Sequence, residues 1–406
     1  MAVVLVIPGA YAMLTVWLAL YGLWHLRGFT ARVWSPSLEV GGLAIWLGML
    51  VYVVVGIGLG WWHAYKASYF EAYVPMLLSP FIVNAVVVAR PPQAMLWLGA
   101  ASGAILSGLV ASYQSLYLQI GRAIGAMNNE IMFGDLSVVL VMFSALGWLY
   151  WAKDKQQTWI RWYLLLGVLM GMWASLLSGT KGGWLSILML AVVLVWLVYS
   201  HWHWAKRNLA AFGVLASIGV LVSLAPHDLV VNRVISGLQG AHIWFNTGQI
   251  TEGSVSIRLE KWNQATDMIA DRPWSGWTTN GSREELSRRM VATGAGEGWI
   301  QTENDFLQAG VVHGLPAIIS YIFFYAGFIW WFSRVKRISV ANPAYFSFAL
   351  AGILLPILML EFGLSVVVLG RNAFRHTLIV WSMILMGYLI SVYLANHENG
   401  AKNKWN

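Results

Sequence analysis

Residues 40–62 read VGGLAIWLGMLVYVVVGIGLGWW, a run without a single charged side chain. A helix needs about 20 apolar residues to cross the hydrocarbon core of a bilayer. The run closes on Trp61 and Trp62, and amphipathic indole rings of this kind gather at the membrane–water interface. This stretch therefore predicts a membrane-spanning helix.

The rest of the chain repeats this pattern. Of its 406 residues, 59% are hydrophobic and 10% are charged, whereas soluble domains carry about 25% charged residues. A chain this apolar cannot cover itself with polar surface, so lipid must surround most of it. The composition predicts an all-α, polytopic transmembrane bundle of eleven or twelve spans. Eleven apolar runs carry this prediction, near residues 2–25, 40–62, 69–89, 94–118, 130–152, 162–178, 184–200, 208–225, 306–332, 344–368 and 373–394.

Three segments follow from the order of these runs. Residues 1–225 hold eight spans, residues 226–305 form one large and partly helical loop, and residues 306–406 hold the last spans and a cytoplasmic tail. If the loop faces outward, thirteen Lys and Arg of the connections lie on the inner side and five on the outer side. The positive-inside rule favours that orientation. The five outer cations are Lys66, Arg122, Lys181, Arg371 and Arg375.

The composition also excludes several classes of function. The formal net charge of +8 is concentrated in short connections, which is typical of anchoring to an anionic leaflet and does not indicate a nucleic-acid partner. The absence of cysteine excludes disulfides, thiolate catalysis and Cys-based metal sites. No histidines and carboxylates cluster at ligand spacing, so we expect neither a metal nor a cofactor.

Two of the outer cations lie in glycine-rich breaks between spans. Lys181 lies in SGTKGGW (178–184), and Arg122 lies in GRAIG (121–125). Glycine lets the backbone approach a ligand closely, and unpaired N–H groups at the start of a helix favour anions. These breaks are candidate anion sites. The alternative is that both are ordinary turns with snorkelling side chains.

The loop holds ten of the 17 acidic side chains of the chain. Within it, Ser256 is positioned to cap a helix over 257–269, whose apolar face is expected to dock on the membrane domain. Arg258 then lies in the first turn, where a cation opposes the helix dipole unless an anion is held beside it. Arg258 is therefore a candidate anion-binding residue. The alternative is a surface ion pair with Glu260 or Asp228.

At the end of the loop, QTENDFLQ (301–308) leads directly into a predicted span. A carboxylate at a membrane boundary is partly desolvated, which raises its pKa and suits it to accept a proton. Glu303 is thus a candidate general base. His313 is a second candidate, although a lone histidine near the end of a span is more often a packing residue.

These stretches together resemble the O-antigen ligase and O-antigen polymerase superfamily. The resemblance covers about residues 115–330. It is carried by an Arg-x-x-Gly segment at 121–136, a Ser-x-x-Lys segment at 178–185, the loop run at 254–276 and the ENDFLQ…HGLP stretch at 303–316. The motifs are short, but their order along the chain matches the family pattern.

The resemblance implies a metal-independent, inverting glycosyltransferase without a cofactor, in the bacterial inner membrane with its active site facing the periplasm. Its donor is an undecaprenyl-diphosphate-linked glycan, and its acceptor is a glycolipid. Arg258, Glu303 and His313 are the catalytic residues that it implies. Lys181, Arg122, Arg258 and Asn304 are the implied ligands of the diphosphate.

Two departures from the family pattern bear on the acceptor. The ligases carry His-Asn where this chain has Glu303-Asn304, and Lys181 stands where the family has arginine, which removes bidentate phosphate geometry. Histidine at the first position is associated with transfer to lipid A–core, so its absence favours a polymerase of repeat units, to which a chain-length regulator could bind. An O-antigen ligase is the alternative. A secondary transporter and a structural envelope protein are further alternatives.

Overall fold

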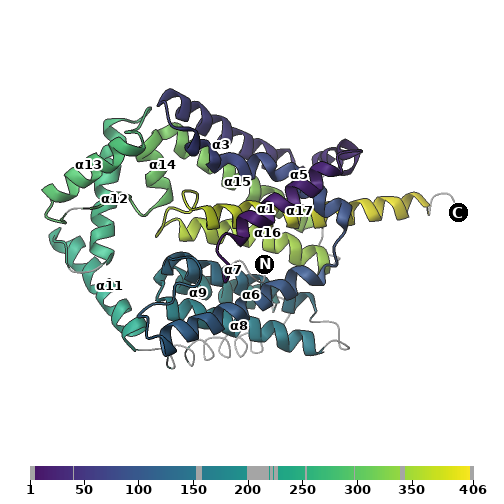
Figure 1. Ribbon diagram of the computed structural model, residues 1–406, viewed down its shortest axis with the longest axis horizontal. Coiled ribbons are helices and arrows are strands. Elements are labelled where there is room, and N and C mark those ends of the chain that lie inside the picture. The colour runs from purple at the N-terminus through teal and green to yellow at the C-terminus, as the bar shows by residue number, and fades with distance from the viewer. Residues whose placement is uncertain are drawn as a thin grey trace. The chain divides into compact units, whose positions relative to one another are not determined.

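The computed structural model describes residues 5–39, 41–151, 158–198, 219, 223, 227–251, 254–296, 298–338 and 343–402. Every regular element in these ranges is helical, and none of their residues lies in a strand. This confirms the predicted all-α class (Figure 1). The chain divides into two compact units, the first comprising 1–10 and 92–238 and the second comprising 11–91 and 239–406.

The first unit is built on helices. They are α6 (Ala94–Ser112), α7 (Glu130–Tyr150), α8 (Thr158–Ser178), α9 (Lys181–Val198) and the first part of α11 (His227–Thr247). Of these, α6 to α9 are apolar. Small residues let α6 and α8 pack closely, since a Cβ on Gly167 would come within 2.8 Å of the Cα of Ala101. Close approach at small residues is how helices associate in lipid, where the hydrophobic effect does not drive them together.

The second unit holds the remaining elements. The N-terminal ones are α1 (Ala10–Trp24), a π-helical turn (Thr30–Trp34), α2 (Ser35–Glu39), α3 (Leu43–Trp62), α4 (Ala67–Phe70), a 3₁₀ turn (Glu71–Tyr73) and α5 (Val74–Ala89). The C-terminal ones are the rest of α11, then α12 (Ser254–Asp271), α13 (Thr279–Ala292), α14 (Asp305–His313), α15 (Leu315–Ile338), α16 (Pro343–Phe362) and α17 (Asn372–Lys402).

Seven helical segments in the described residues are long and apolar enough to cross a membrane, and three shorter ones are apolar. These ten match ten of the eleven expected spans, which supports a polytopic membrane protein. The eleventh, 208–225, lies almost entirely outside the described residues. The seven long segments are Leu43–Trp62, Ala67–Ala89, Ala94–Tyr117, Glu130–Tyr150, Thr158–Ser178, Leu315–Lys336 and Asn372–Ala395.

The expected span 306–332 is broken, so its predicted start is wrong. Helix α14 ends at His313 and α15 begins at Leu315, with Gly314 between them at a φ of +76°. A proline at the second position of α15 is compatible with a helix start but not with a helix that continues through it. The backbone of Pro273 closes the break, because the Leu315 N–H donates to its carbonyl at 2.6 Å.

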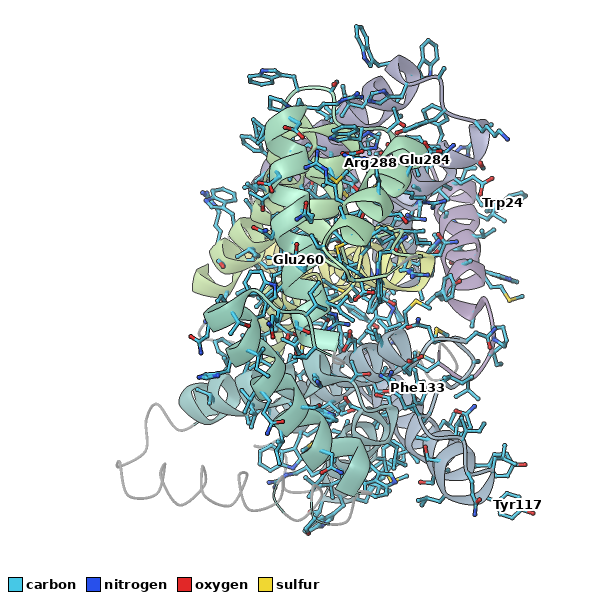
Figure 2. All side chains as sticks on the ribbon, turned by 90° about the vertical axis from the view of Figure 1, so that its left-hand side faces the viewer. Trp24, Tyr117, Phe133, Glu260, Glu284 and Arg288 are labelled. Atoms are coloured by element: carbon cyan, nitrogen blue, oxygen red, sulfur yellow. The ribbon has the colours of Figure 1, made fainter. Side chains whose placement is uncertain are left out.

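The charged loop of residues 226–305 folds into helices with a small core of their own. Ala265 and Met268 of α12, Leu286 and Met290 of α13, and Val311 of α14 are buried together. Charged side chains lie outside this core, among them Glu284 and Arg288 on α13 (Figure 2). The three helices thus pack on one another to form a support for the residues at their ends.

The predicted start of α12 is also wrong. The helix begins at Ser254, two residues before the expected cap. The hydroxyl of Ser256 donates to the carbonyl of Thr251 at 3.1 Å and accepts from the N–H of Thr251 at 3.2 Å. These two hydrogen bonds connect the first turn of α12 to the backbone of Thr251. Of the predicted apolar face, Ala265 and Ile269 join the loop core.

Candidate active site

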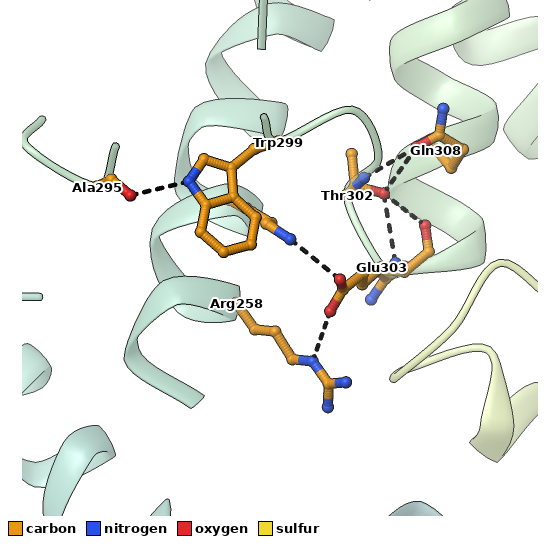
Figure 3. Close-up of polar contacts among 8 residues, drawn as sticks. Arg258, Ala295, Trp299, Thr302, Glu303 and Gln308 are labelled. Carbon is orange, nitrogen blue, oxygen red and sulfur yellow. Dashed lines mark hydrogen bonds and ion pairs between the residues drawn. The ribbon is translucent and has the colours of Figure 1, made fainter. Parts of the chain in front are cut away.

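Glu303 lies between two cations of α12. Arg258 donates from Nε to Oε2 of Glu303 at 2.8 Å, and Lys261 donates from Nζ to Oε1 at 3.1 Å (Figure 3). Residues three apart on a helix share a face, which is why one carboxylate meets both. Two of the residues selected from the sequence, Arg258 and Glu303, are therefore in direct contact. The ion pair of Arg258 is with Glu303 and not with Glu260, which accepts from Trp244 and Gln264. The binding of an external anion by Arg258 stays a prediction.

Lys261 is a residue that the sequence analysis missed. Its side chain is only 2% exposed, and its Nζ lies 4.2 Å from the centre of the Trp299 ring. An ammonium over an indole face is attracted by the ring quadrupole. The sequence contained a clue to Lys261, because it lies three residues after Arg258. That spacing places both cations on one face of the predicted helix.

The pKa of Glu303 is lowered, which is opposite to the expected direction. Burial by itself raises the pKa of this carboxyl, but the charge of Lys261 and the hydrogen bond from Arg258 outweigh burial, and the pKa falls below its ordinary value of 4.5. Glu303 is consequently a stably ionised carboxylate in the unliganded protein. The side chain is 36% exposed, so it is also accessible from solvent.

The backbone around Glu303 is held in an uncommon conformation. Glu303 has a φ of +52°, in the left-handed region that non-glycine residues seldom adopt. Thr302 braces the turn, because its N–H donates to Oε1 of Gln308 at 2.9 Å and its hydroxyl donates to the carbonyl of Asn304 at 2.9 Å. Strained residues of this kind persist where the surrounding structure over-determines them, often at functional sites.

Asn304, which the resemblance assigned to the diphosphate, is the N-cap of α14. Its Oδ1 accepts from the Leu307 N–H at 3.1 Å, and the residue is buried. The side-chain oxygen is thus used to satisfy a helix terminus, as asparagine commonly does. The structure gives Asn304 a role in orienting the turn that carries Glu303.

Asp305 is buried immediately after this cap. Its Oδ2 accepts from the Tyr321 hydroxyl at 2.6 Å and from the Leu369 N–H at 2.9 Å. Burial raises its pKa from 3.8 to about 6, against these hydrogen bonds, which lower it. Asp305 therefore fastens the start of α14 to α15 and to the connection before α17, away from the cations that face Glu303.

His313 lies at the far end of α14. Eight residues of helix separate it from Asp305, or about 12 Å at 1.5 Å per residue, so the structure does not place it beside Glu303. Its Nε2 lies 3.0 Å from the Tyr69 hydroxyl, and its ring stacks on His63 with centroids 5.9 Å apart. Burial and, to a lesser extent, His63 lower its pKa to about 4. His313 is thus neutral near pH 7 and packs within an aromatic cluster.

Arg122 and Lys181 belong to the first unit. Arg122 donates from Nε to the carbonyl of Ser178 at 2.8 Å and pairs with Glu130. Ser178 is the last residue of α8 and Lys181 is the first of α9, so Arg122 holds the glycine-containing break that precedes Lys181. The two cations selected in this unit are therefore parts of one local structure, whereas Arg258 and Glu303 belong to the second unit.

Within the described residues, no group of three or more His, Asp or Glu side chains is arranged to hold a metal ion. Independence from metal stays a prediction, because it concerns the reaction as a whole. At the candidate site, the second unit brings together one carboxylate, that of Glu303, and the two cations Arg258 and Lys261.

Comparison with known proteins bears on the same stretch of chain. Residues 165–322 match the O-antigen ligase family. This match confirms the resemblance to the O-antigen ligase and polymerase superfamily, over about two fifths of the chain, and it indicates a ligase-type or polymerase-type function. Lys181, Arg258, Glu303 and His313 lie within the segment that matches the O-antigen ligase family, whereas Arg122 precedes it.

An uncharacterised protein of Haemophilus influenzae is also similar. It is 20% identical to this chain over 246 residues, which cover 59% of this chain and 60% of the relative. The chain therefore spans about three fifths of the length of that relative.

Proposed function

We propose that the chain transfers a glycan from an undecaprenyl-diphosphate donor to an acceptor glycolipid, and that it does so as a polymerase of repeat units. The observation that carries the proposal is the contact of the Glu303 carboxylate with both Arg258 and Lys261. A transfer of this kind needs a proton acceptor for the attacking hydroxyl and a fixed positive charge for the leaving diphosphate. Both requirements meet within this one cluster.

In the proposed reaction, Glu303 takes the proton of the acceptor hydroxyl. The hydroxyl oxygen at the same time forms a bond to the anomeric carbon of the donor sugar. The bond between that carbon and the diphosphate breaks, and the diphosphate leaves with the electron pair. Attack opposite the leaving group inverts the anomeric centre. Carboxylates serve as proton acceptors at anomeric carbons in inverting glycoside hydrolases as well.

Arg258 is proposed to stabilise the leaving diphosphate. Its Nε is committed to Glu303, whereas the terminal nitrogens of its guanidinium turn away from that carboxylate in Figure 3. When those nitrogens bind an anion, the anion partly neutralises the charge of the guanidinium. Arg258 then lowers the pKa of Glu303 by less than it does in the unliganded protein. Donor binding would then strengthen the base at the moment it is needed.

Asn304 is proposed to contribute to the diphosphate site through its amide nitrogen. Lys181 and Arg122 are proposed to bind an anionic group within the first unit, Lys181 from a helix start. His313 is proposed to support the site from the far end of α14. The proposed setting is the bacterial inner membrane, with the charged loop in the periplasm, in keeping with the positive-inside count. No metal or cofactor takes part in the proposed reaction.

An O-antigen ligase is the second candidate, because the matched family is described by that name. The two functions differ in the acceptor, which is another lipid-linked glycan for a polymerase and lipid A–core for a ligase. The carboxylate at position 303, where the ligases carry histidine, favours the polymerase.

Reconstitution of the purified protein tests the proposal. The donor is a polyprenyl-diphosphate oligosaccharide, divalent metal is chelated, and lipid A–core is present in one reaction and absent in the other. A ladder of lengthening lipid-linked glycans without the core is the expected result. A single shift of the core band would identify a ligase, and no transfer by folded protein in either reaction would contradict both functions.

A further inference from the structure

Lys261 is a cation that solvent barely reaches. Its side chain is 2% exposed and lies with Nζ 4.2 Å from the centre of the Trp299 ring. The indole is itself fixed, since its Nε1 donates to the carbonyl of Ala295 at 2.9 Å. While Trp299 covers it, Lys261 contacts Glu303 and cannot extend to a bound substrate.

Arg258 differs from Lys261 in its exposure and in the direction of its donors. Its side chain is 20% exposed, and its Nη atoms bond to no residue that the structure describes. Figure 3 shows the end of its guanidinium beyond the Nε that bonds to Glu303. The two cations on one carboxylate are thus a covered one and an accessible one.

We infer that Lys261 is a positioning residue for the proposed reaction, which holds the carboxylate of Glu303 ionised and in one orientation while Arg258 meets the anionic donor. The inference rests on the proposed role of Glu303 as the base. Lys261 occupies Oε1 and Arg258 occupies Oε2, so the carboxylate cannot rotate about its last bond without losing both contacts. Fixed orientation of a base is worth a large factor in rate, since small misplacements of reacting groups slow enzymes strongly.

The other charged groups near Glu303 are engaged elsewhere. On α12, Glu260 accepts from Trp244 at 3.1 Å and from Gln264 at 2.8 Å. On α14, Asp305 accepts from Tyr321 and from the Leu369 N–H. The ionisation of Glu303 therefore depends on Lys261 and Arg258. Burial raises the pKa of Glu303, and without the charge of Lys261 only Arg258 would counteract that effect.

Substitution Lys261→Met tests the inference, because methionine keeps much of the length and apolar volume of the stem without the charge. The protonation of Glu303 is followed by infrared spectroscopy of protein containing ¹³C-carboxyl glutamate, with Glu303→Gln used to assign its band. We expect the midpoint to move up by about one pH unit or more, since an opposite charge within hydrogen-bond distance shifts a carboxyl by about 1–3 units. With the lipid-linked donor, kcat is expected to fall and its acid limb to move to higher pH, while KM for the donor stays within about twofold.

Glu260→Gln is the matched control, since it removes a buried charge from the same helix that does not contact Glu303. It is expected to leave both the Glu303 midpoint and the pH profile unchanged. If Lys261→Met does not fold, Lys261→Gln also removes the charge while keeping an N–H donor, and the same upward shift is expected. An unchanged midpoint with a uniform loss of kcat at all pH values would overturn the inference.

The two readouts separate this inference from the proposed function. The infrared titration requires only folded protein, so an upward shift would support the role of Lys261 even in a protein that transfers no glycan. Normal transfer by Lys261→Met with an unchanged acid limb would leave the proposed function intact and reject the positioning role.

Discussion

Nε of Arg258 lies 2.8 Å from Oε2 of Glu303, although 45 residues separate the two along the chain. The contact joins the second turn of α12 to the turn just before α14, and the loop core of α12, α13 and α14 holds these elements together. A cation in an early turn of a helix opposes the helix dipole, and the carboxylate beside it offsets that cost. The pair thus couples the fold of the loop to the chemistry proposed for it.

Glu303→Gln is expected to lower transfer by about 10²–10⁴-fold, the usual contribution of a positioned proton acceptor. Glutamine has the same shape and can still accept from one of the cations, so the protein should remain inserted and folded. Single-turnover transfer with the lipid-linked donor measures the loss. Glu260→Gln serves as the control, and full activity of Glu303→Gln alongside loss in His313→Ala would move the role of base to His313.

Arg258→Ala is expected to reduce transfer by about 10²–10³-fold, because removing one fixed donor to developing charge typically has this effect. Arg258→Lys keeps the charge but not the fork of donors, so it should recover only part of the rate. Binding of the donor, measured by its protection of the protein from thermal unfolding, should weaken in both variants. Equal activity of wild type and Arg258→Ala would be inconsistent with a role at the diphosphate.

The pH dependence of transfer follows from the lowered pKa of Glu303. A base with its pKa below 4.5 is largely ionised in the free enzyme from pH 8 down to pH 5, so its protonation should have little effect on kcat/KM in that interval. Wild type is therefore expected to keep a nearly flat kcat/KM profile between these values. A loss of kcat/KM centred near pH 6 or 7 would instead indicate a base with a raised pKa.

Asp305 makes the opposite prediction for stability. Its pKa is about 6 in the folded protein against 3.8 ordinarily, so the folded state holds the proton more tightly than the unfolded state. The free energy of unfolding should then decrease as pH rises from 4 through 6, by at most about 3 kcal/mol at roughly 1.4 kcal/mol per unit. Asp305→Asn should remove this dependence. Thermal unfolding in micelles at pH 5 and pH 7 compares the two proteins, and identical slopes would contradict the assignment.

Gly314 is expected to tolerate no side chain. A Cβ on it would come within 2.5 Å of the Pro273 carbonyl oxygen, and its φ of +76° is unfavourable for alanine. Gly314→Ala should therefore destabilise the protein by about 1–3 kcal/mol, the usual cost of overpacking and backbone strain. Gly58→Ala is a matched control within α3, because a Cβ there meets no atom within 4 Å. Apparent melting temperatures of the two variants check the difference.

The class of the fold and most of its helices could be predicted from the amino-acid sequence alone. Whether a run such as 40–62 enters the bilayer depends on its own length and hydropathy, which are local properties. The same is true of the charged loop at 226–305 and of the choice of Arg258 and Glu303 as candidates. The start of α15 was missed because a turn distant in sequence, at Pro273, closes the break at Gly314.

Which charged side chains contact one another depends on the tertiary structure. It paired Arg258 with Glu303 in place of Glu260, added Lys261 beneath Trp299, and separated His313 from Glu303 by the length of α14. The direction in which the pKa of Glu303 shifts depends on burial and on the two cations of α12. Distances of a few ångströms decide which of these effects is larger. Such distances result from the packing of segments that are far apart in the chain, whereas the hydropathy of a segment depends only on its own residues.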